Sequence, residues 1–268
     1  MGDGAALSAA EIERYRRDGF LKPDFRLPAK MRGRLLDLAE RLVRDNAHVG
    51  DEPLASPHVP GSGVQNLKSD SDWMAFPTYG PIVDMVADLI GPDIILWGTT
   101  LFHKAARGGR AVPWHRDGRY WPINPLATTS VWIAVDDCTV ENGCLRCLQG
   151  SHLAGDTGRH YRSTRDDILI PETLYEDQYD EADARDIELA AGELVIFDVF
   201  TAHGSNANAS DKRRIGYAMR YIPGSAHYDH HDIPIADSPG AAHHTRPLTL
   251  VRGTDRTGLN DFQIGHPS

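Results

Sequence analysis

The chain has 268 residues, of which 41% are hydrophobic and 25% are charged. That balance is typical of a folded globular protein, and the length allows one large domain or two small ones. The formal net charge is −10 at pH 7, which disfavours a protein that binds nucleic-acid phosphates. No apolar run reaches the roughly 20 residues of a membrane span, and the first residues lack a signal-peptide core. We therefore expect a cytoplasmic protein with neither a nucleic-acid nor a membrane partner.

Three helices are predicted in the first 92 residues. Ser8 and Glu11 form a capping-box pattern at the start of the first helix, and Gly19 fits the position just past its end. Apolar residues every three or four positions predict a second helix that ends near Asn46. The remaining features are a loop rich in Pro, Gly and Ser at 53–63 and a third helix at 80–89.

Runs of β-branched and aromatic residues follow, separated by turn signals, and predict strands. The predicted strands lie at 94–104, 128–135, 144–148, 194–200 and 215–221. No regular alternation of strands with helices occurs, which argues against a parallel sheet and favours a β-sandwich or barrel with helices packed outside it. A charged insert at 159–186 has no clear periodicity and is a candidate lid. The tail from Gly224 is expected to be loop.

Two groups of metal-binding residue types are interpreted as structural. Cys138, Cys144 and Cys147 are spaced like part of a zinc site, but the last two interrupt an apolar run, so we expect buried, reduced thiols. The tail also contains histidines, in a stretch rich in Pro, Asp and Gly where no regular element would fix ligand geometry. We expect no metal at these tail histidines, which are His227, His230, His231, His243 and His244.

The segment 112–118, with the sequence VPWHRDG, carries the most informative pattern. His115 and Asp117 are two residues apart, so in an extended segment both side chains project to the same side and offer two ligands to a divalent metal. His203 stands at the end of a predicted strand and Arg214 opens the next, so an antiparallel pair would bring them close together. Two histidines and one aspartate match the facial triad of non-haem Fe(II) oxygenases, beside which an arginine can hold a co-substrate carboxylate.

Strand alternation assigns the residues after Arg214 to two faces. The face with Ile215, Tyr217, Met219 and Tyr221 is suited to packing under the helices, and the face with Arg214, Gly216, Ala218 and Arg220 is suited to lining a site. The sequence leaves two possible roles open for each of two side chains, Arg220 and Lys104. Arg220 either contributes to the site or pairs with a structural carboxylate, and Lys104 either helps to bind an anion or is a solvated strand end.

Several spaced motifs together resemble the phytanoyl-CoA dioxygenase family over 65–221. They are W-H-x-D followed by Tyr-Trp-Pro, then Glu-Asn-Gly-Cys-Leu-Arg with Gly-Ser-His, and finally H-x-S-x-x-N followed by an arginine. The resemblance implies a mainly β protein with flanking helices around a double-stranded β-helix (a jelly-roll, cupin-like core). It also implies dependence on Fe(II), O2 and 2-oxoglutarate. On this basis we expect one oxygenase domain over 1–268, with a helical part at 1–92, a β-helix core at 93–223 and a loop-rich tail at 224–268.

The resemblance also assigns roles to individual residues. His115, Asp117 and His203 match the iron ligands. Arg214 matches the arginine that holds the distal carboxylate of 2-oxoglutarate, with Ser205 beside it. Thr100 and Trp132 fall where the family also contacts 2-oxoglutarate.

Departures from the family pattern bear on the reaction. Arg116 stands where the family usually has Gln, and Gln149 replaces the proline of a P-G-S-H turn. Asp117 is retained, whereas halogenating relatives replace it with a small residue, so we expect hydroxylation with release of succinate and CO2. The alternatives are a non-catalytic metal-binding β-helix protein, such as a sensor, and a zinc hydrolase with the same ligands. No protein partner is implied.

Arginines near the motifs suggest a small, anionic substrate, although internal salt bridges explain them equally well. They are Arg110, Arg116, Arg119 and Arg146. Arg119 shares the parity of His115 and Asp117 and is therefore the better candidate for binding the substrate, whereas alternation points Arg116 away. The candidate substrate residues are Arg116, Arg119, Tyr120 and Arg220.

Overall fold

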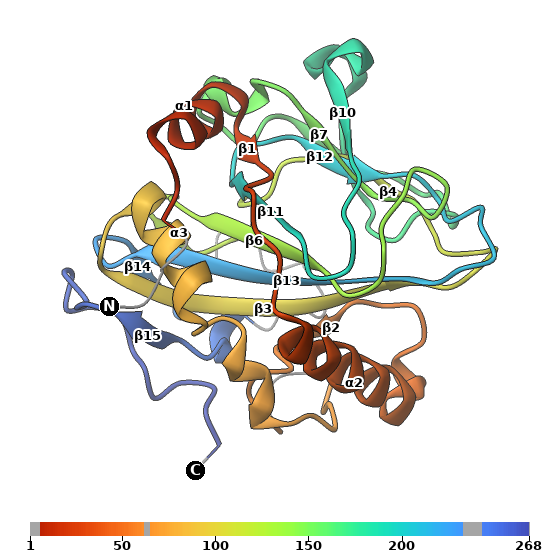
Figure 1. The fold of residues 1–268 in the computed structure, drawn as a ribbon. Coiled ribbons are helices and arrows are strands. Elements are labelled where there is room, and N and C mark those ends of the chain that lie inside the picture. Colours follow the sequence, from red (N-terminus) through yellow and green to blue (C-terminus); the bar gives the residue numbers. More distant parts are fainter. Residues whose placement is uncertain (1–5, 62–64, 233–242, 268) are drawn as a thin grey trace.

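The structure is a computed structural model that describes residues 6–61, 65–232 and 243–267. Its α-helices, all in the N-terminal part, are α1 (Ala9–Asp18), α2 (Ala29–Asp45) and α3 (Gly80–Ile90) (Figure 1). Short 3₁₀ turns connect other parts of the chain, at Ala47–Val49, Ser71–Ala75, Ser151–Ala154, Glu176–Gln178, Glu181–Asp183 and His243–Thr245. None of the described helices is long and apolar enough to cross a membrane.

Two antiparallel sheets form the centre of the molecule. The larger has the order β1 (Phe20–Leu21), β11 (Leu194–Asp198), β6 (Thr129–Ala134), β13 (Arg214–Pro223), β3 (Ile94–Lys104) and β15 (Thr249–Arg252), with β2 (Leu54–Ala55) also on β3. The smaller has the order β10 (Ala184–Ile187), β7 (Leu145–Leu148), β12 (His203–Ser205) and β4 (Val112–His115). Two further pairs are β5 (Ile123–Asn124) with β14 (His227–Tyr228) and β8 (His160–Arg162) with β9 (Glu172–Leu174).

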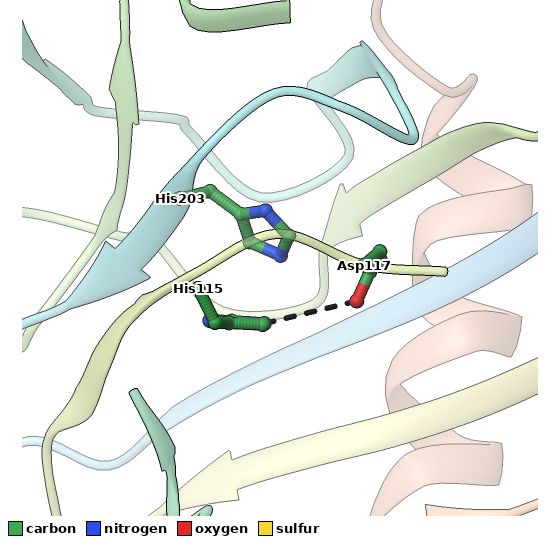
Figure 2. Close-up of side chains that lie close together, drawn as sticks. All are labelled: His115, Asp117 and His203. Atoms are coloured by element: carbon green, nitrogen blue, oxygen red, sulfur yellow. Dashed lines mark ion pairs between the residues drawn. The ribbon is translucent and has the colours of Figure 1, made fainter. Parts of the chain in front are cut away.

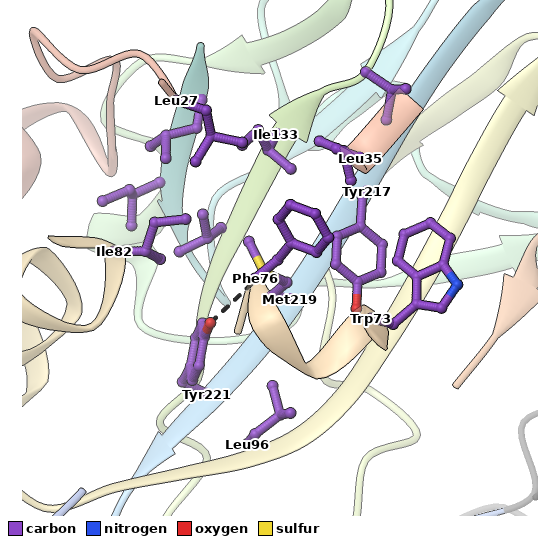
Figure 3. Packing of buried hydrophobic residues seen from close by; sticks show 14 of the residues in the cluster. Leu27, Leu35, Trp73, Phe76, Ile82, Leu96, Ile133, Tyr217, Met219 and Tyr221 are labelled. Carbon is purple, nitrogen blue, oxygen red and sulfur yellow. Dashed lines mark hydrogen bonds between the residues drawn. The ribbon is translucent and has the colours of Figure 1, made fainter. Parts of the chain in front are cut away.

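The helices cover one face of the larger sheet, as Figure 1 shows for α2 and α3. The apolar face of β13 packs under them, and its Tyr217 ring lies 4.7 Å from the Trp73 ring (Figure 3). Tyr221 belongs to the same cluster and donates a hydrogen bond to the Pro77 carbonyl. The alternation predicted for this strand is therefore confirmed, because its odd-numbered residues belong to the helix-covered core.

The other face of the larger sheet packs against the smaller sheet. A second apolar cluster joins Trp132, Phe197 and Ala218 of the larger sheet to Leu145 and Cys147 of the smaller one. Two facing antiparallel sheets with helices outside form a double-stranded β-helix, so the predicted fold class is confirmed.

Most predicted elements are present within a few residues of their expected ends. The capping box at Ser8 and Glu11 is complete, and Gly19 has a φ of 84°, in the left-handed region that favours glycine. The five predicted strands correspond to β3, β6, β7, β11 and β13.

Three segments expected to lack regular structure contain strands. The predicted loop at 53–63 includes β2, the insert at 159–186 includes β8, β9 and part of β10, and the tail includes β14 and β15. The loop and tail predictions are wrong at these strands. β2 and β15 become strands because they pair with the edge of β3, and this long-range pairing has no signal in the local sequence. Residues 62–63 of the loop and 233–242 of the tail lie outside the described residues.

Candidate active site

A cavity of about 620 Å³ lies between the two sheets. Phe102, Trp132 and Ala218 of the larger sheet line it on one side, and His115 and His203 of the smaller sheet line it on the other. The β8–β9 pair contributes further wall residues, so the insert at 159–186 borders the cavity.

Three side chains converge on this cavity (Figure 2). His115 ends β4 and His203 begins β12, and the two residues are register partners with ring centroids 4.2 Å apart. Asp117 follows two residues after β4 and places its Oδ1 3.7 Å from His115 Nε2. One ligand atom from each residue lies within 4.8 Å of the others, and no other such group of three occurs among the described residues.

The hydrogen bonds of the two histidines fix which ring nitrogen is available. His115 Nδ1 lies 2.9 Å from the Pro113 carbonyl oxygen, and His203 Nδ1 lies 2.9 Å from the Thr201 carbonyl oxygen. Because a carbonyl only accepts, each Nδ1 carries and donates a proton, which leaves Nε2 as the ring nitrogen that can bind a metal in the neutral tautomer. Burial and the neighbouring His203 lower the pKa of His115 to about 4, so the His115 ring is neutral at pH 7.

The donor set fits a divalent transition metal. Asp117 Oδ2 is buried and has no hydrogen-bond partner, which leaves a carboxylate oxygen to complement the two imidazole nitrogens. Two neutral imidazoles and one carboxylate are the ligands of the facial triad, and the backbone carbonyls that orient the rings are typical outer partners of metal-bound histidines.

Arg214 lies buried at the start of β13 and also lines the cavity. Its Nη2 donates to the Gly143 carbonyl oxygen at 2.9 Å, its guanidinium carbon lies 5.4 Å from the Trp132 ring centre, and its Nε has no hydrogen-bond partner. The cavity thus contains a buried cation on the sheet that faces the two histidines.

The expected pairing of the strand at His203 with the strand at Arg214 is wrong. β12 belongs to the smaller sheet and pairs with β4 and β7, whereas β13 belongs to the larger sheet and pairs with β3 and β6. The chain crosses from one sheet to the other between them. Both residues still reach one cavity because the two sheets face each other.

The comparison with known families agrees with this geometry. The family model "Phytanoyl-CoA dioxygenase (PhyH)" matches residues 15–216, which include the three converging side chains and Arg214. The chain belongs to the phytanoyl-CoA dioxygenase family.

Curated members of the phytanoyl-CoA dioxygenase family match over different lengths. A phytanoyl-CoA dioxygenase domain-containing protein 1 homolog from Dictyostelium discoideum is 32% identical over 145 residues, which cover 53% of this chain and 52% of the relative. An ectoine dioxygenase from Bordetella parapertussis is 27% identical over 247 residues, 81% of this chain and 75% of the relative. The chain spans about half the length of several curated relatives that it matches.

Solved structures agree with the family's fold. The apo form of ThoJ, a non-heme monooxygenase, has a TM-score of 0.71 and 28% identity, and the match covers 91% of this chain and 84% of that one. A structure of CytC3 with Fe(II) and alpha-ketoglutarate has a TM-score of 0.65 at 22% identity, covering 96% and 93% of the two chains, and supports the fold alone.

Lys104 is the residue for which the sequence was most misleading. Its side chain is buried rather than solvated, lines the cavity, and donates a hydrogen bond from Nζ to the Asn206 carbonyl oxygen at 2.5 Å. Burial, with a smaller effect from Arg214, lowers the pKa of the Lys104 ammonium to about 6. The interpretation as a solvated strand end is therefore wrong, and the parity that Lys104 shares with Thr100 was the useful signal.

The other family-matched residues also lie at the cavity. Thr100, Trp132 and Ser205 all line it. Gly216 shares the face of Arg214, and a Cβ there would overlap the Trp132 ring, so the absence of a side chain at this position is what accommodates the tryptophan.

Arg220 has no structural carboxylate as a partner. Its Nη1 donates to Thr100 Oγ1 at 3.0 Å, and it makes no ion pair within 4.0 Å with any described carboxylate. Of its two interpretations, pairing with a structural carboxylate is thereby contradicted. Trp97, which belongs to no sequence motif, and Trp121, from the Tyr-Trp-Pro motif, lie beside it on the cavity wall.

The arginines near the motifs have separate environments. Arg116 Nη1 lies 2.9 Å from an Asp156 carboxylate oxygen and its Nη2 donates to the Ser151 carbonyl oxygen, so its guanidinium is held by the protein itself. Arg119 donates to the His160 carbonyl oxygen at 3.1 Å, with its guanidinium 5.4 Å from the Tyr120 ring.

The other two arginines form salt bridges, as the alternative interpretation held. Arg110 pairs with Glu52, and Arg146 pairs with Glu181 and Asp186.

The three cysteines are buried, as expected, and two of the tail histidines have hydrogen-bond partners within the protein. All three cysteines are free and buried, and burial raises the pKa of the Cys144 thiol to about 11. His243 Nδ1 lies 3.0 Å from the Tyr228 hydroxyl, and His230 Nε2 lies 2.8 Å from the Arg246 carbonyl oxygen. In the described part of the tail, no group of three residues could hold a metal ion.

Proposed function

We propose that this protein is an Fe(II)- and 2-oxoglutarate-dependent dioxygenase that uses O2 to hydroxylate a small metabolite and releases succinate and CO2. The observation that carries the proposal is the convergence of His115, Asp117 and His203, with both Nε2 atoms available, on a cavity that also holds the buried Arg214. In this proposal the chain 1–268 acts as one oxygenase domain in the cytoplasm.

His115 Nε2, His203 Nε2 and an Asp117 carboxylate oxygen would hold the iron. When bound there, Fe(II) supplies the activation of O2 that is coupled to decarboxylation of 2-oxoglutarate. The protein's part is to keep the donors in place: the Pro113 and Thr201 carbonyls orient the two rings and hold their protons on Nδ1.

Arg214 would hold the distal carboxylate of 2-oxoglutarate. Its planar guanidinium can form two parallel hydrogen bonds with a carboxylate, and burial strengthens such a pair. Ser205 and Thr100 supply hydroxyl groups on the same cavity, and the Trp132 ring lies beside the guanidinium. Lys104 lies opposite Arg214 in the strand register, and in its protonated form it would increase the attraction for an anion.

The substrate would occupy the remaining part of the cavity. We propose that Arg119 and Tyr120, which line it after Asp117, contact the substrate. Arg116 is a weaker candidate because its guanidinium is bound by Asp156. Retention of Asp117 favours hydroxylation, since this carboxylate occupies the position that halogenating relatives leave open. The names of the relatives, a phytanoyl-CoA dioxygenase and an ectoine dioxygenase among them, support an oxygenase but not one particular substrate.

Conversion of 2-oxoglutarate to succinate tests the proposal without knowledge of the substrate. Protein with Fe(II), O2 and 2-oxoglutarate should form succinate slowly, and a panel of metabolites should reveal the substrate by faster release. His115→Ala, Asp117→Ala and His203→Ala should each abolish both the turnover and tight Fe(II) binding, because a three-ligand site loses most of its affinity with one ligand gone.

The two alternatives give different results in the same assay. A non-catalytic sensor would bind the metal and form no succinate with any metabolite. A zinc hydrolase would be active with zinc in the absence of O2. Turnover at the original rate in any of the three alanine variants under limiting iron would contradict the assignment of the site.

A further inference from the structure

Two arginines project from the same face of β13. Arg214 and Arg220 are six residues apart, which corresponds to about 20 Å along an extended strand. The carboxyl carbons of a five-carbon diacid are only about 5 Å apart when it is extended. The two guanidinium groups also have different partners: Gly143 and Trp132 for Arg214, and Thr100 with three other rings for Arg220. A co-substrate bound at Arg214 therefore leaves Arg220 available.

Arg220 is a partly buried cation without a counter-ion of its own among the described residues. Its Nε is buried and lacks a hydrogen-bond partner, and its one side-chain hydrogen bond goes to the neutral hydroxyl of Thr100. The acid with the main electrostatic influence on it is Asp117, whose charge a bound metal would neutralise. A buried charge is costly unless an opposite charge compensates it. The arrangement therefore favours an anion from outside the chain.

Aromatic rings enclose the Arg220 guanidinium. Its central carbon lies 5.6 Å from the Trp121 ring centre, 6.0 Å from that of Trp97 and 5.9 Å from that of Phe102. Trp97 and Trp121 contact each other edge to face at 4.5 Å, and all three rings line the cavity. The surroundings thus combine the positive charge of Arg220, to which Arg246 adds, with flat apolar walls, which suits an acidic group attached to a planar or apolar body.

This part of the cavity is close to the metal ligands. Arg220 lines the same cavity as His115, Asp117 and His203, and its charge acts on His115 and Asp117. A molecule held at Arg220 by its acidic group would present its body beside the metal centre.

We propose that Arg220 binds the acidic group of the substrate, a carboxylate, sulfonate or phosphonate, and that the attached body lies against Trp97 and Trp121. This inference rests on the proposed function, because it names the substrate class of the same site. It assigns the charge selectivity to Arg220, in the larger sheet, in addition to the contacts proposed for Arg119.

Binding of simple aryl acids tests the inference. Isothermal titration of the anaerobic protein loaded with Fe(II) and 2-oxoglutarate would compare phenylacetate and benzylphosphonate with the neutral phenylacetamide. The acids should bind about ten- to hundredfold more tightly than the amide, as expected for a buried charge-assisted contact. Arg220→Met, which keeps the apolar stem, should abolish that preference, and Arg220→Lys should keep part of it.

Arg146→Met is the matched control. Arg146 also has its guanidinium over a tryptophan, 5.1 Å from the Trp114 ring centre, but it pairs with Asp186 in β10 and with Glu181 in the turn before that strand. Its loss should leave the preference for acids unchanged. Thermal melts of each variant would verify that it is folded.

Three results would overturn the inference. They are no binding of either acid by the original protein, a preference for acids over the amide that survives in Arg220→Met, or a loss of 2-oxoglutarate binding in that variant as large as its loss of acid binding. The last result would assign Arg220 to the co-substrate. The proposed function fails by a different result, which is the absence of any Fe(II)-dependent conversion of 2-oxoglutarate to succinate.

Discussion

Lys104 and Arg214 lie directly opposite each other in the antiparallel register of β3 and β13, and both line the cavity. Neither forms an ion pair within 4.0 Å with a carboxylate in the described part of the chain. Burial and the repulsion between a protonated Lys104 and Arg214 lower the pKa of Lys104. An incoming carboxylate would relieve that repulsion.

The affinity for 2-oxoglutarate should therefore increase as the pH falls from 8 to 6. The pKa of Lys104 is about 6, so its amine is mostly neutral at pH 8 and about half protonated at pH 6. An anion binds the protonated form better, and one linked proton changes the binding constant by at most about tenfold per pH unit. The pKa of His115, about 4, lies below this range and does not contribute. Titration calorimetry in buffers of different ionisation enthalpy would measure the proton uptake.

Lys104→Met should make 2-oxoglutarate binding weaker at pH 6 and nearly independent of pH. A dependence on pH that persists in this variant would contradict the role of Lys104.

Replacing Arg214 by lysine should raise the apparent KM for 2-oxoglutarate. An ammonium cannot reproduce the two parallel hydrogen bonds of a guanidinium, and a loss of about 2 kcal/mol corresponds to roughly thirtyfold. Arg213→Lys is the neighbouring control, because Arg213 pairs with Glu40 and Asp136 outside the cavity. Initial rates of succinate formation at varied 2-oxoglutarate would measure both. Equal KM values for the two variants would locate the anchor elsewhere.

Gly216→Ala should destabilise the protein and weaken 2-oxoglutarate binding. The new methyl group would overlap the Trp132 ring, and overpacking of this kind costs about 1–3 kcal/mol. Gly33→Ala is the opposite case, since Gly33 lies within α2 with nothing near its Cβ position, and should stabilise by about 0.5–1 kcal/mol. Urea unfolding of both variants would test the pair. An unchanged midpoint for Gly216→Ala would contradict the packing argument.

Arg116→Ala should lower the free energy of unfolding by about 1–3 kcal/mol. The Arg116 side chain is only 7% exposed and binds Asp156 and the Ser151 carbonyl. Its removal would break these charge-assisted hydrogen bonds and leave a void. Arg159→Ala removes an exposed pair with Asp177, both about two-thirds exposed, and should change stability by under about 1 kcal/mol. Chemical denaturation would compare them, and equal effects would show that burial is not decisive at Arg116.

The sequence alone was sufficient wherever the determining interactions are local. The capping box of Ser8 and Glu11 depends on residues three positions apart, and the two faces of β13 follow from strand alternation. The spacing of His115 and Asp117 put both on one side for the same reason. The motif order from 65 to 221 was enough to identify the family.

Only the tertiary structure decided which distant elements meet. His203 faces His115 because β12 pairs with β4 in the smaller sheet, not because its strand pairs with that of Arg214. Lys104 is buried because Gly143 and Asn206, far from it in the sequence, lie against its side chain, and burial depends on what packs against a strand end rather than on its own sequence. Likewise, Arg116 pairs with Asp156, whereas Arg220 forms no ion pair with a described carboxylate. Ion pairing depends on residues that are far apart in the chain, and no local sequence pattern predicts which of them are close in space.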